Sequence, residues 1–416
     1  MPHRVRRCTR AVAALAAVLL LPGAARGEEG PVRVGFLTIR SGALAAGGRQ
    51  MEEGLNLFLK QRNQTLAGRR VELFTADTAG QPALTKTKIQ ELVERQKVQV
   101  VIGPLAAFEA LAVDGYIRQA GIPVISPSAA AEDLTQRKPN PWFVRAVGTS
   151  AQPTHALGEY AAKELGYRRI AMIADDFAFG YELSAGFQRT FELNGGKIVQ
   201  KLWSPLNVAD YGSYVAQLKP DVDAVFAGFA GANGLRFLQQ YREYGRKIPV
   251  LGAMTTVDEG ILKNMGDEAL GVISAGWYAA TSDAPGNARF VQAYEAEYHA
   301  QPGYYGVGAY TAGLFLEQAL QQVQGRIEDR KAFMAALRRV HLREGPLGDV
   351  HLDEYGNPVM NVYVRKVERV GGRLENVVLK TYPQVSQFWT FDPRDFLKAP
   401  VYSRDSPPAE HLEAAR

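Results

Sequence analysis

VRVGFLTIRSGALAAGGRQMEEGLNLFL, residues 32–59, contains a complete strand, loop and helix unit. Residues 32–39 are rich in apolar and β-branched residues, and residues 40–48 are mostly glycine and other small residues. Met51 and Leu55 then recur at the spacing of one helix face. A strand, a glycine-rich turn and an amphipathic helix in this order are typical of parallel α/β proteins.

The same unit recurs in two successive sets. In the first set, strands are expected at residues 69–77, 98–104 and 122–128, and helices at 82–96, 105–119 and 131–136. In the second set, strands are expected at 168–175, 197–203, 223–229, 248–253 and 271–278, and helices at 152–165, 180–193, 211–218 and 231–244. Strands that alternate with helices predict parallel sheets covered on both faces. The expected fold class is therefore α/β with two such domains.

The C-terminal third changes in pattern. Helices are expected at 286–300, 306–323 and 329–341 with no strand between them, followed by a β-hairpin made of 358–368 and 375–382 around Gly371. Residues 386–416 are proline-rich and charged, and we expect this extension to lie on the surface or to fray.

The N-terminus has the three-part pattern of a secretory signal peptide. A short basic segment precedes an apolar run at residues 11–21, and small residues follow up to Gly27. The run is too short to span a bilayer comfortably. Residues 1–27 are therefore predicted to be removed on export to the periplasm, and Cys8 lies before the apolar run, where it cannot carry a lipoprotein anchor.

The charge balance excludes a nucleic-acid partner. The chain of 416 residues has a formal net charge of +5, with 48 Lys and Arg against 43 Asp and Glu. Five of the arginines lie in residues 1–27, so the remainder is balanced and lacks a basic footprint. Hydrophobic residues make up 46% of the chain and charged residues 22%, which is typical of a globular protein.

Motifs for catalysis are absent from the sequence. There is no phosphate loop, no dinucleotide fingerprint and no nucleophile elbow, so we expect neither an enzyme nor a cofactor. The histidines are scattered without a metal-binding spacing, and no metal site is expected. Residues 349–357, DVHLDEYGN, do not have the glycine and the terminal glutamate at the spacing that a calcium loop requires, and they are interpreted as a plain turn.

Four segments together resemble a known family. They are residues 32–59, VVIGPLAAFEALAVDGYIRQAGIPVISPSAAAEDLT at 100–135, DDFAFGYELSAGFQ at 175–188 and GPLGDVHLDEYGNP at 345–358. Their order and spacing are similar to those of the Leu/Ile/Val-binding type of periplasmic solute-binding protein, over essentially all of residues 31–385.

The resemblance implies two Rossmann-like lobes joined by a three-strand hinge, with a small-molecule ligand enclosed between them. Lobe 1 would comprise 31–146 plus 279–342, and lobe 2 would comprise 148–277 plus 345–385. It also implies that the protein, expected to be a monomer, delivers its ligand to a membrane ABC permease.

The expected pocket departs from that of the amino-acid binders. In that family, hydroxyl residues in two lobe-1 loops hold the ligand carboxylate, whereas this sequence has mainly alanines there, with Ser128 the nearest hydroxyl. An acidic residue normally binds the ammonium group, but the corresponding place is near Met254 and Thr255. Burying an ammonium without an anionic partner is costly, which argues against an α-amino acid.

The candidate ligand-binding residues lie on loops at strand ends or near the crossings. Arg40 could pair with a carboxylate, and the aromatic rings could stack on an aromatic ligand, although each is equally compatible with a solvated or a core position. The candidates are Arg40, Ser41, Ala107, Phe108, Ser128, Ala129, Ala130, Phe179, Phe229, Met254, Tyr278 and Tyr305.

The leading functional hypothesis is an extracytoplasmic solute-binding protein of an ABC importer. Its ligand would be an aromatic or apolar carboxylate. The alternatives are binding of branched-chain or other amino acids, or a ligand-sensing receptor of the same fold, because fold alone does not decide between transport and sensing.

Overall fold

The computed structural model describes residues 1, 3 and 30–414, and the chain from Pro31 onwards forms one compact unit. The predicted signal peptide lies almost entirely outside the described residues. Within the part that the structure describes, no helix combines the length and the apolar character needed to cross a membrane.

The first sheet is built by the N-terminal strand and helix units. Its strands are β1 (Val32–Thr38), β2 (Thr65–Leu66), β3 (Arg69–Asp77), β4 (Val100–Ile102), β5 (Val124–Ser126) and β6 (Phe143–Arg145), in the order β2-β3-β1-β4-β5-β6. All pairs are parallel except β2 with β3. Its helices are α1 (Ala45–Lys60), α2 (Pro82–Gln90) with a π-helical continuation (Glu91–Arg95), and α3 (Ala107–Ala120). The unit predicted from residues 32–59 is confirmed.

The second sheet follows in the chain. Its strands are β7 (Arg169–Asp175), β8 (Lys197–Ser204), β9 (Ala224–Gly228), β10 (Val250–Ala253), β11 (Ile273–Gly276), β12 (His341–Gly345), β13 (Gly348–Leu352), β14 (Pro358–Val370) and β15 (Arg373–Val385). The order is β12-β13-β14-β11-β10-β9-β7-β8, and β15 pairs with β14. Strands β7 to β11 are parallel to one another, and β12 to β15 add antiparallel pairs. The predicted α/β class is confirmed, with two mixed, mostly parallel sheets.

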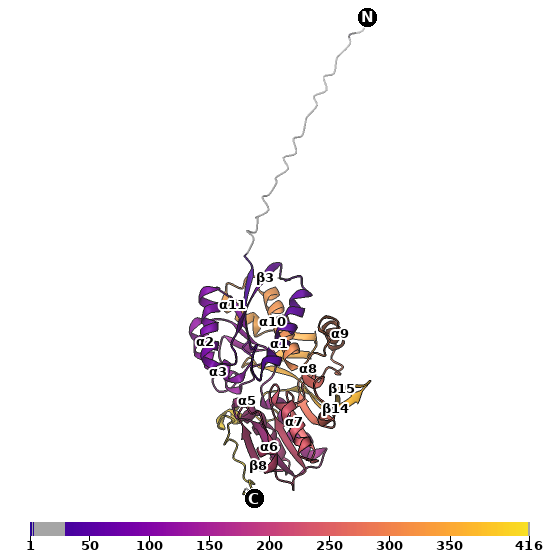
Figure 1. The fold of residues 1–416 in the computed structure, drawn as a ribbon. Coiled ribbons are helices and arrows are strands. Elements are labelled where there is room, and N and C mark those ends of the chain that lie inside the picture. Colours follow the sequence, from indigo (N-terminus) through magenta and orange to yellow (C-terminus); the bar gives the residue numbers. More distant parts are fainter. Residues whose placement is uncertain (2, 4–29, 415–416) are drawn as a thin grey trace. The chain divides into compact units, whose positions relative to one another are not determined.

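Helices cover both sheets, as Figure 1 shows for α1, α2 and α3 around the first sheet and for α6 and α7 in the part of the chain that holds the second sheet. Two later helices, α10 and α11, lie with the first sheet in the same view, and α10 packs along α1. The helices not yet given are α4 (Ala151–Lys163), α5 (Ala178–Leu193), α6 (Gly212–Gln217), α7 (Asn233–Glu243), α8 (Glu259–Leu262), α9 (Asn287–Tyr298), α10 (Tyr304–Gln322), α11 (Arg330–Leu337) and α12 (Pro393–Lys398).

The central strands are buried along their whole length. Every residue of β4, β5 and β9 is buried, and all three are short apolar segments without alternation. This is the pattern expected of parallel strands covered on both faces. Burial of the sheets fixes the position of the loops at their carboxyl ends.

Three expectations need correction. The helix expected over 329–341 ends at Leu337, and the chain enters β12 at His341. Residues 349–357 are not only a turn, because their first part belongs to β13. The helix expected at 131–136 is a single 3-10 turn, Glu132–Thr135.

The C-terminal extension does not fray as expected. Phe396 of α12 and Tyr402 are 1% and 6% exposed, and both pack with Phe388 in one apolar cluster. The Tyr402 hydroxyl also contacts the buried His155 ring at 3.1 Å. Aromatic burial therefore fixes a segment whose proline and charge content predicted exposure.

Candidate functional site

A cavity lies where the carboxyl ends of both sets of parallel strands come together. It is bordered by residues that follow β4, β5, β7, β9 and β10. Open parallel sheets bind ligands beyond the carboxyl ends of their strands. The lining residues are Leu44, Leu105, Ala106, Ala107, Ser128, Ala130, Phe177, Phe179, Ala230, Thr255, Tyr304 and Tyr305.

Four helices begin at this cavity. Leu44 precedes α1, Ala107 is the first residue of α3, Phe179 lies in the first turn of α5, and Tyr304 is the first residue of α10. The first N–H groups of a helix have no intrahelical acceptor, and the helix dipole makes this end positive. At two of these starts a carboxylate already accepts a backbone hydrogen bond, because Tyr304 N donates to Asp258 Oδ1 at 2.6 Å and Ala106 N donates to Glu109 Oε2 at 2.9 Å. The starts of α1 and α5 are therefore the better candidates for stabilising a negative charge on a ligand.

The lining is aromatic on two sides. Phe177 and Phe179 stack with ring centres 5.9 Å apart, and Phe108 packs edge-on against Phe177 from behind. Tyr304 and Tyr305 meet edge to face at 4.6 Å. Among the residues that the structure describes as lining the cavity, none carries a charged side chain. The described lining therefore offers no carboxylate to pair with an α-ammonium group.

Hydrogen bonds between side chains and backbone carbonyl groups hold the loop after β5 in place. Ser128 Oγ donates to the carbonyl of Leu105 at 2.9 Å, and Tyr304 Oη donates to the carbonyl of Ser128 at 2.6 Å. The fully buried Arg145 donates to the carbonyl of Ala129 at 2.6 Å. These carbonyl oxygens are already paired, which favours the backbone N–H groups as the groups left for a ligand.

Asp175 holds the loop that contains Ala230. The carboxylate accepts hydrogen bonds from Ala230 N and Asn233 Nδ2, both at 2.8 Å. Burial raises the pKa of this carboxyl to about 7, although the two hydrogen bonds oppose the shift.

This pKa predicts a loss of stability as the pH rises. The folded state retains the Asp175 proton up to about pH 7, whereas an unfolded aspartate releases it near pH 4. Its contribution to the free energy of unfolding is complete below pH 4 and declines by about 4 kcal/mol as the pH rises through 7. Melting temperatures at pH 5 and pH 8 measure the effect. We expect Asp175→Asn to reduce the difference, and an unchanged difference would contradict the assignment.

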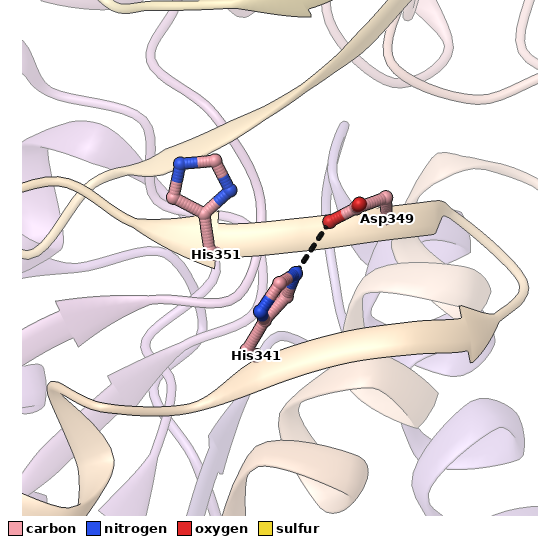
Figure 2. A group of neighbouring side chains, drawn as sticks. All are labelled: His341, Asp349 and His351. Carbon is pink, nitrogen blue, oxygen red and sulfur yellow. Dashed lines mark hydrogen bonds and ion pairs between the residues drawn. The ribbon is translucent and has the colours of Figure 1, made fainter.

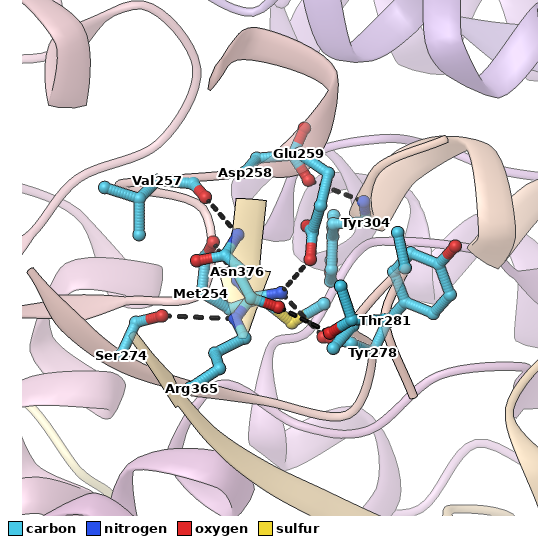
Figure 3. A network of polar contacts seen from close by, with 12 residues as sticks. Met254, Val257, Asp258, Glu259, Ser274, Tyr278, Thr281, Tyr304, Arg365 and Asn376 are labelled. Carbon is cyan, nitrogen blue, oxygen red and sulfur yellow. Dashed lines mark hydrogen bonds and ion pairs between the residues drawn. The ribbon is translucent and has the colours of Figure 1, made fainter. Parts of the chain in front are cut away.

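A buried ionic network lies behind the second-sheet side of the cavity (Figure 3). Arg365 of β14 is 0% exposed and donates to Glu259 Oε1 at 2.6 Å. Its guanidinium also donates to the carbonyls of Tyr278 and Met254 at 2.6 and 2.8 Å and to Ser274 Oγ at 3.1 Å. Arg365 thereby connects β14, β11 and the loop after β10 that supplies Thr255 to the cavity.

Direct contacts also join the two groups of loops. Asp258, after β10, accepts hydrogen bonds from Tyr304 N at 2.6 Å and from Gln50 Nε2 at 3.1 Å, and Figure 3 shows Asp258 beside Tyr304. The carbonyl of Ala43 accepts from Ala232 N at 3.2 Å. Direct hydrogen bonds therefore join segments from the two sides of the cavity.

The structure brings only some of the predicted site residues to the cavity. Those that line it are Ala107, Ser128, Ala130, Phe179 and Tyr305. Arg40 and Ser41 are exposed, and Arg40 forms an ion pair with Glu52 at 2.8 Å. The geometry therefore does not support the predicted contact of Arg40 and Ser41 with a ligand.

The other predicted residues lie one layer behind the lining. Phe229 packs against Tyr211 and Phe237 in the second-sheet core. Met254 and Tyr278 provide carbonyls for Arg365. Ala129 and Phe108 are neighbours of lining residues but do not line the cavity themselves.

The residues that line the cavity but were not predicted from the sequence include Leu44, Leu105, Ala106, Ala230 and Tyr304. Ala230 and Thr255 directly follow the predicted residues Phe229 and Met254, so these two predictions were wrong by one position. Loops lack the periodicity that fixes register in helices and strands. Tyr304 could have been predicted from the sequence, because the glycine directly before it marks the start of α10.

This arrangement defines a class of protein. Two mostly parallel sheets present their strand ends to one cavity, whose described lining offers hydrogen bonds and aromatic rings. These are the features of a site that binds a small molecule.

Comparison with known proteins identifies the family. Residues 31–373 match the periplasmic binding protein family, and the chain belongs to it. The protein is a non-enzymatic solute-binding protein of an ABC transporter, with the type I periplasmic binding fold. A curated relative, Leu/Ile/Val-binding protein homolog 6 of Brucella melitensis, is 26% identical over 89% of this chain and 96% of its own length.

Three solved structures are similar over almost their whole length. An ABC transporter substrate-binding protein from Sphaerobacter thermophilus is 33% identical, covers 86% of this chain and 99% of its own, and has a TM-score of 0.80. A solute-binding protein from Rhodopseudomonas palustris BisB5, in complex with 3,4-dihydroxybenzoic acid, is 32% identical with the same coverage and a TM-score of 0.82. Another from R. palustris, in complex with benzoate, is 27% identical, covers 86% and 98%, and has a TM-score of 0.81.

Proposed function

We propose that this protein captures a small aromatic carboxylate in the periplasm and delivers it to a membrane ABC permease. The observation that carries the proposal is the cavity itself, where four helix starts and four aromatic residues surround a space without an acidic side chain in the described lining. The helix starts favour an anion, and the rings favour an aromatic body.

Two similar structures support this ligand class, because they hold 3,4-dihydroxybenzoic acid and benzoate. An apolar lining could also accept an aliphatic side chain, and the Brucella relative carries the name of a Leu/Ile/Val-binding protein homolog. An amino acid remains the second candidate for this reason.

The proposal includes the division of the chain into two lobes that close on the ligand. The three passages of the chain between the sheets, after β6, after β11 and before β12, would serve as the hinge. Contacts such as Asp258 with Tyr304 would then form on closure, and a ligand touching both sides would favour the closed state by its differential affinity. Export by the predicted signal peptide and action as a monomer belong to the same proposal.

A matched ligand panel tests the ligand class by thermal shift and calorimetry. Benzoate, 4-hydroxybenzoate and 3,4-dihydroxybenzoate should raise the melting temperature, by an amount that corresponds to about 2.7 kcal/mol when the ligand is 100-fold above its dissociation constant. Benzamide lacks the negative charge, cyclohexanecarboxylate has a saturated ring in place of the aromatic one, and phenylalanine adds an ammonium group. All three should bind more weakly, and a larger shift with leucine or phenylalanine than with any benzoate would contradict the proposal.

A further inference from the structure

Two histidines and an aspartate meet on the β12–β13 hairpin, apart from the ligand cavity. His341 and His351 are directly opposite each other in the antiparallel register, with ring centres 5.5 Å apart. Asp349 lies two residues before His351 on the same strand, so both side chains belong to one face. Figure 2 shows the three side chains grouped on this hairpin.

This face of the hairpin is directed away from the core. The neighbouring pair, Leu342 and Val350, is buried, whereas the side chains of His341 and Asp349 are 39% and 53% exposed. His341 Nε2 and Asp349 Oδ1 are 2.7 Å apart, and one nitrogen or oxygen atom from each of the three side chains lies within 4.8 Å of the others. The group is compact and can be reached from solvent.

We propose that His341, Asp349 and His351 form a binding site for one divalent first-row metal ion, with Zn²⁺ as the preferred ion. Imidazole nitrogens and a carboxylate oxygen are established zinc ligands. Four-coordinate zinc with bonds near 2.0–2.1 Å places its ligand atoms about 3.3 Å apart. Small side-chain rotations achieve this spacing from the present one, and water completes the fourth position.

The backbone at the proposed ligands is held by two glutamines. Gln318 of α10 accepts from His341 N at 2.8 Å and donates to the His341 carbonyl at 3.1 Å. Gln384 of β15 donates to the Asp349 carbonyl at 3.1 Å. Ligands whose backbone is already fixed lose less freedom when the ion binds, which favours binding at this hairpin.

The ion would join β12 to β13, next to the point where the chain leaves α11 and enters the second sheet. None of the three residues lines the ligand cavity. Metal binding should therefore stabilise this hairpin without competing for the transported solute, and the two sites can be measured independently.

Isothermal titration with ZnCl₂ tests the site in the chain from residue 28, prepared without a histidine tag. We expect one equivalent of Zn²⁺ to bind and the melting temperature to rise in its presence and return after chelation. Co²⁺ bound in place of Zn²⁺ should show visible d–d absorption typical of a low-coordinate nitrogen and oxygen site. Absence of saturable binding at tens of micromolar Zn²⁺ would overturn the proposal.

Single substitutions locate the ion. His341→Ala and His351→Ala should each weaken binding about 10- to 100-fold, and Asp349→Asn should weaken it about 10-fold. His411→Gln is the control, because His411 is exposed and lies far along the chain from the hairpin. Equal loss in the control, or unchanged affinity in His351→Ala, would place the ion elsewhere and reject the site.

Discussion

Replacing Arg365 with methionine should lower the free energy of unfolding by about 3–5 kcal/mol, the cost of removing one partner of a buried ion pair. The change leaves the Glu259 carboxylate, 1% exposed, without its cation. It also leaves the carbonyls of Met254 and Tyr278 without the donors that they have in the intact protein. Urea unfolding with linear extrapolation measures the loss.

Arg369→Met is the matched control for Arg365→Met. Arg369 belongs to the same strand and pairs with Asp267 at 2.7 Å, but the two side chains are 48% and 67% exposed. Its removal should cost less than about 1 kcal/mol because solvent screens the pair. Similar losses in both variants would show that burial does not determine the effect.

The double variant Arg365→Met with Glu259→Gln separates charge from packing. It removes both charges, so it should recover part of the loss if an unpaired carboxylate is the main cost. It also provides a measurement if the single variant does not fold. A double variant no more stable than Arg365→Met would assign the loss to the carbonyl contacts instead.

The fold could be predicted because burial leaves a periodic trace in the sequence. Strands such as β4 are uninterrupted apolar runs, and α1 repeats its apolar residues at helical spacing. The β12–β13 hairpin was missed because its outward face carries His341, Asp349 and His351, and its short strands show little apolar alternation. The pairing of the two histidines depends on register between strands, which the spacing along the sequence does not reveal.

The sequence predicted which loops form the site but not which of their residues line the cavity. The loops at the strand ends were correctly located, yet the nominated Phe229 and Met254 are each one position before the residue that lines the cavity. A strand that ends one residue earlier or later exchanges a core residue for a lining residue.

Ser128→Asp should weaken the binding of benzoate-type ligands about 100-fold. Ser128 lines the cavity and is 4% exposed, so an aspartate there places a negative charge in the space proposed for an anion. At about 6 Å and an effective dielectric constant near 20, the repulsion is about 2.8 kcal/mol, which corresponds to about 100-fold. Calorimetry at pH 8, where the new carboxyl is more fully ionised, measures the loss.

Ser128→Asn is the matched control, because asparagine has the size of aspartate, is neutral and can still donate to the carbonyl of Leu105. Its effect measures the steric part of the change, and the difference between the two variants measures the charge part. Arg40→Ala should leave binding unchanged, since Arg40 pairs with Glu52 outside the cavity. If the aspartate and asparagine variants bind benzoate equally, the ligand's charge does not lie near Ser128. If the aspartate variant instead gains affinity for amino acids, the missing acidic residue is what excludes them from the native cavity, because the new carboxylate then pairs with their ammonium group.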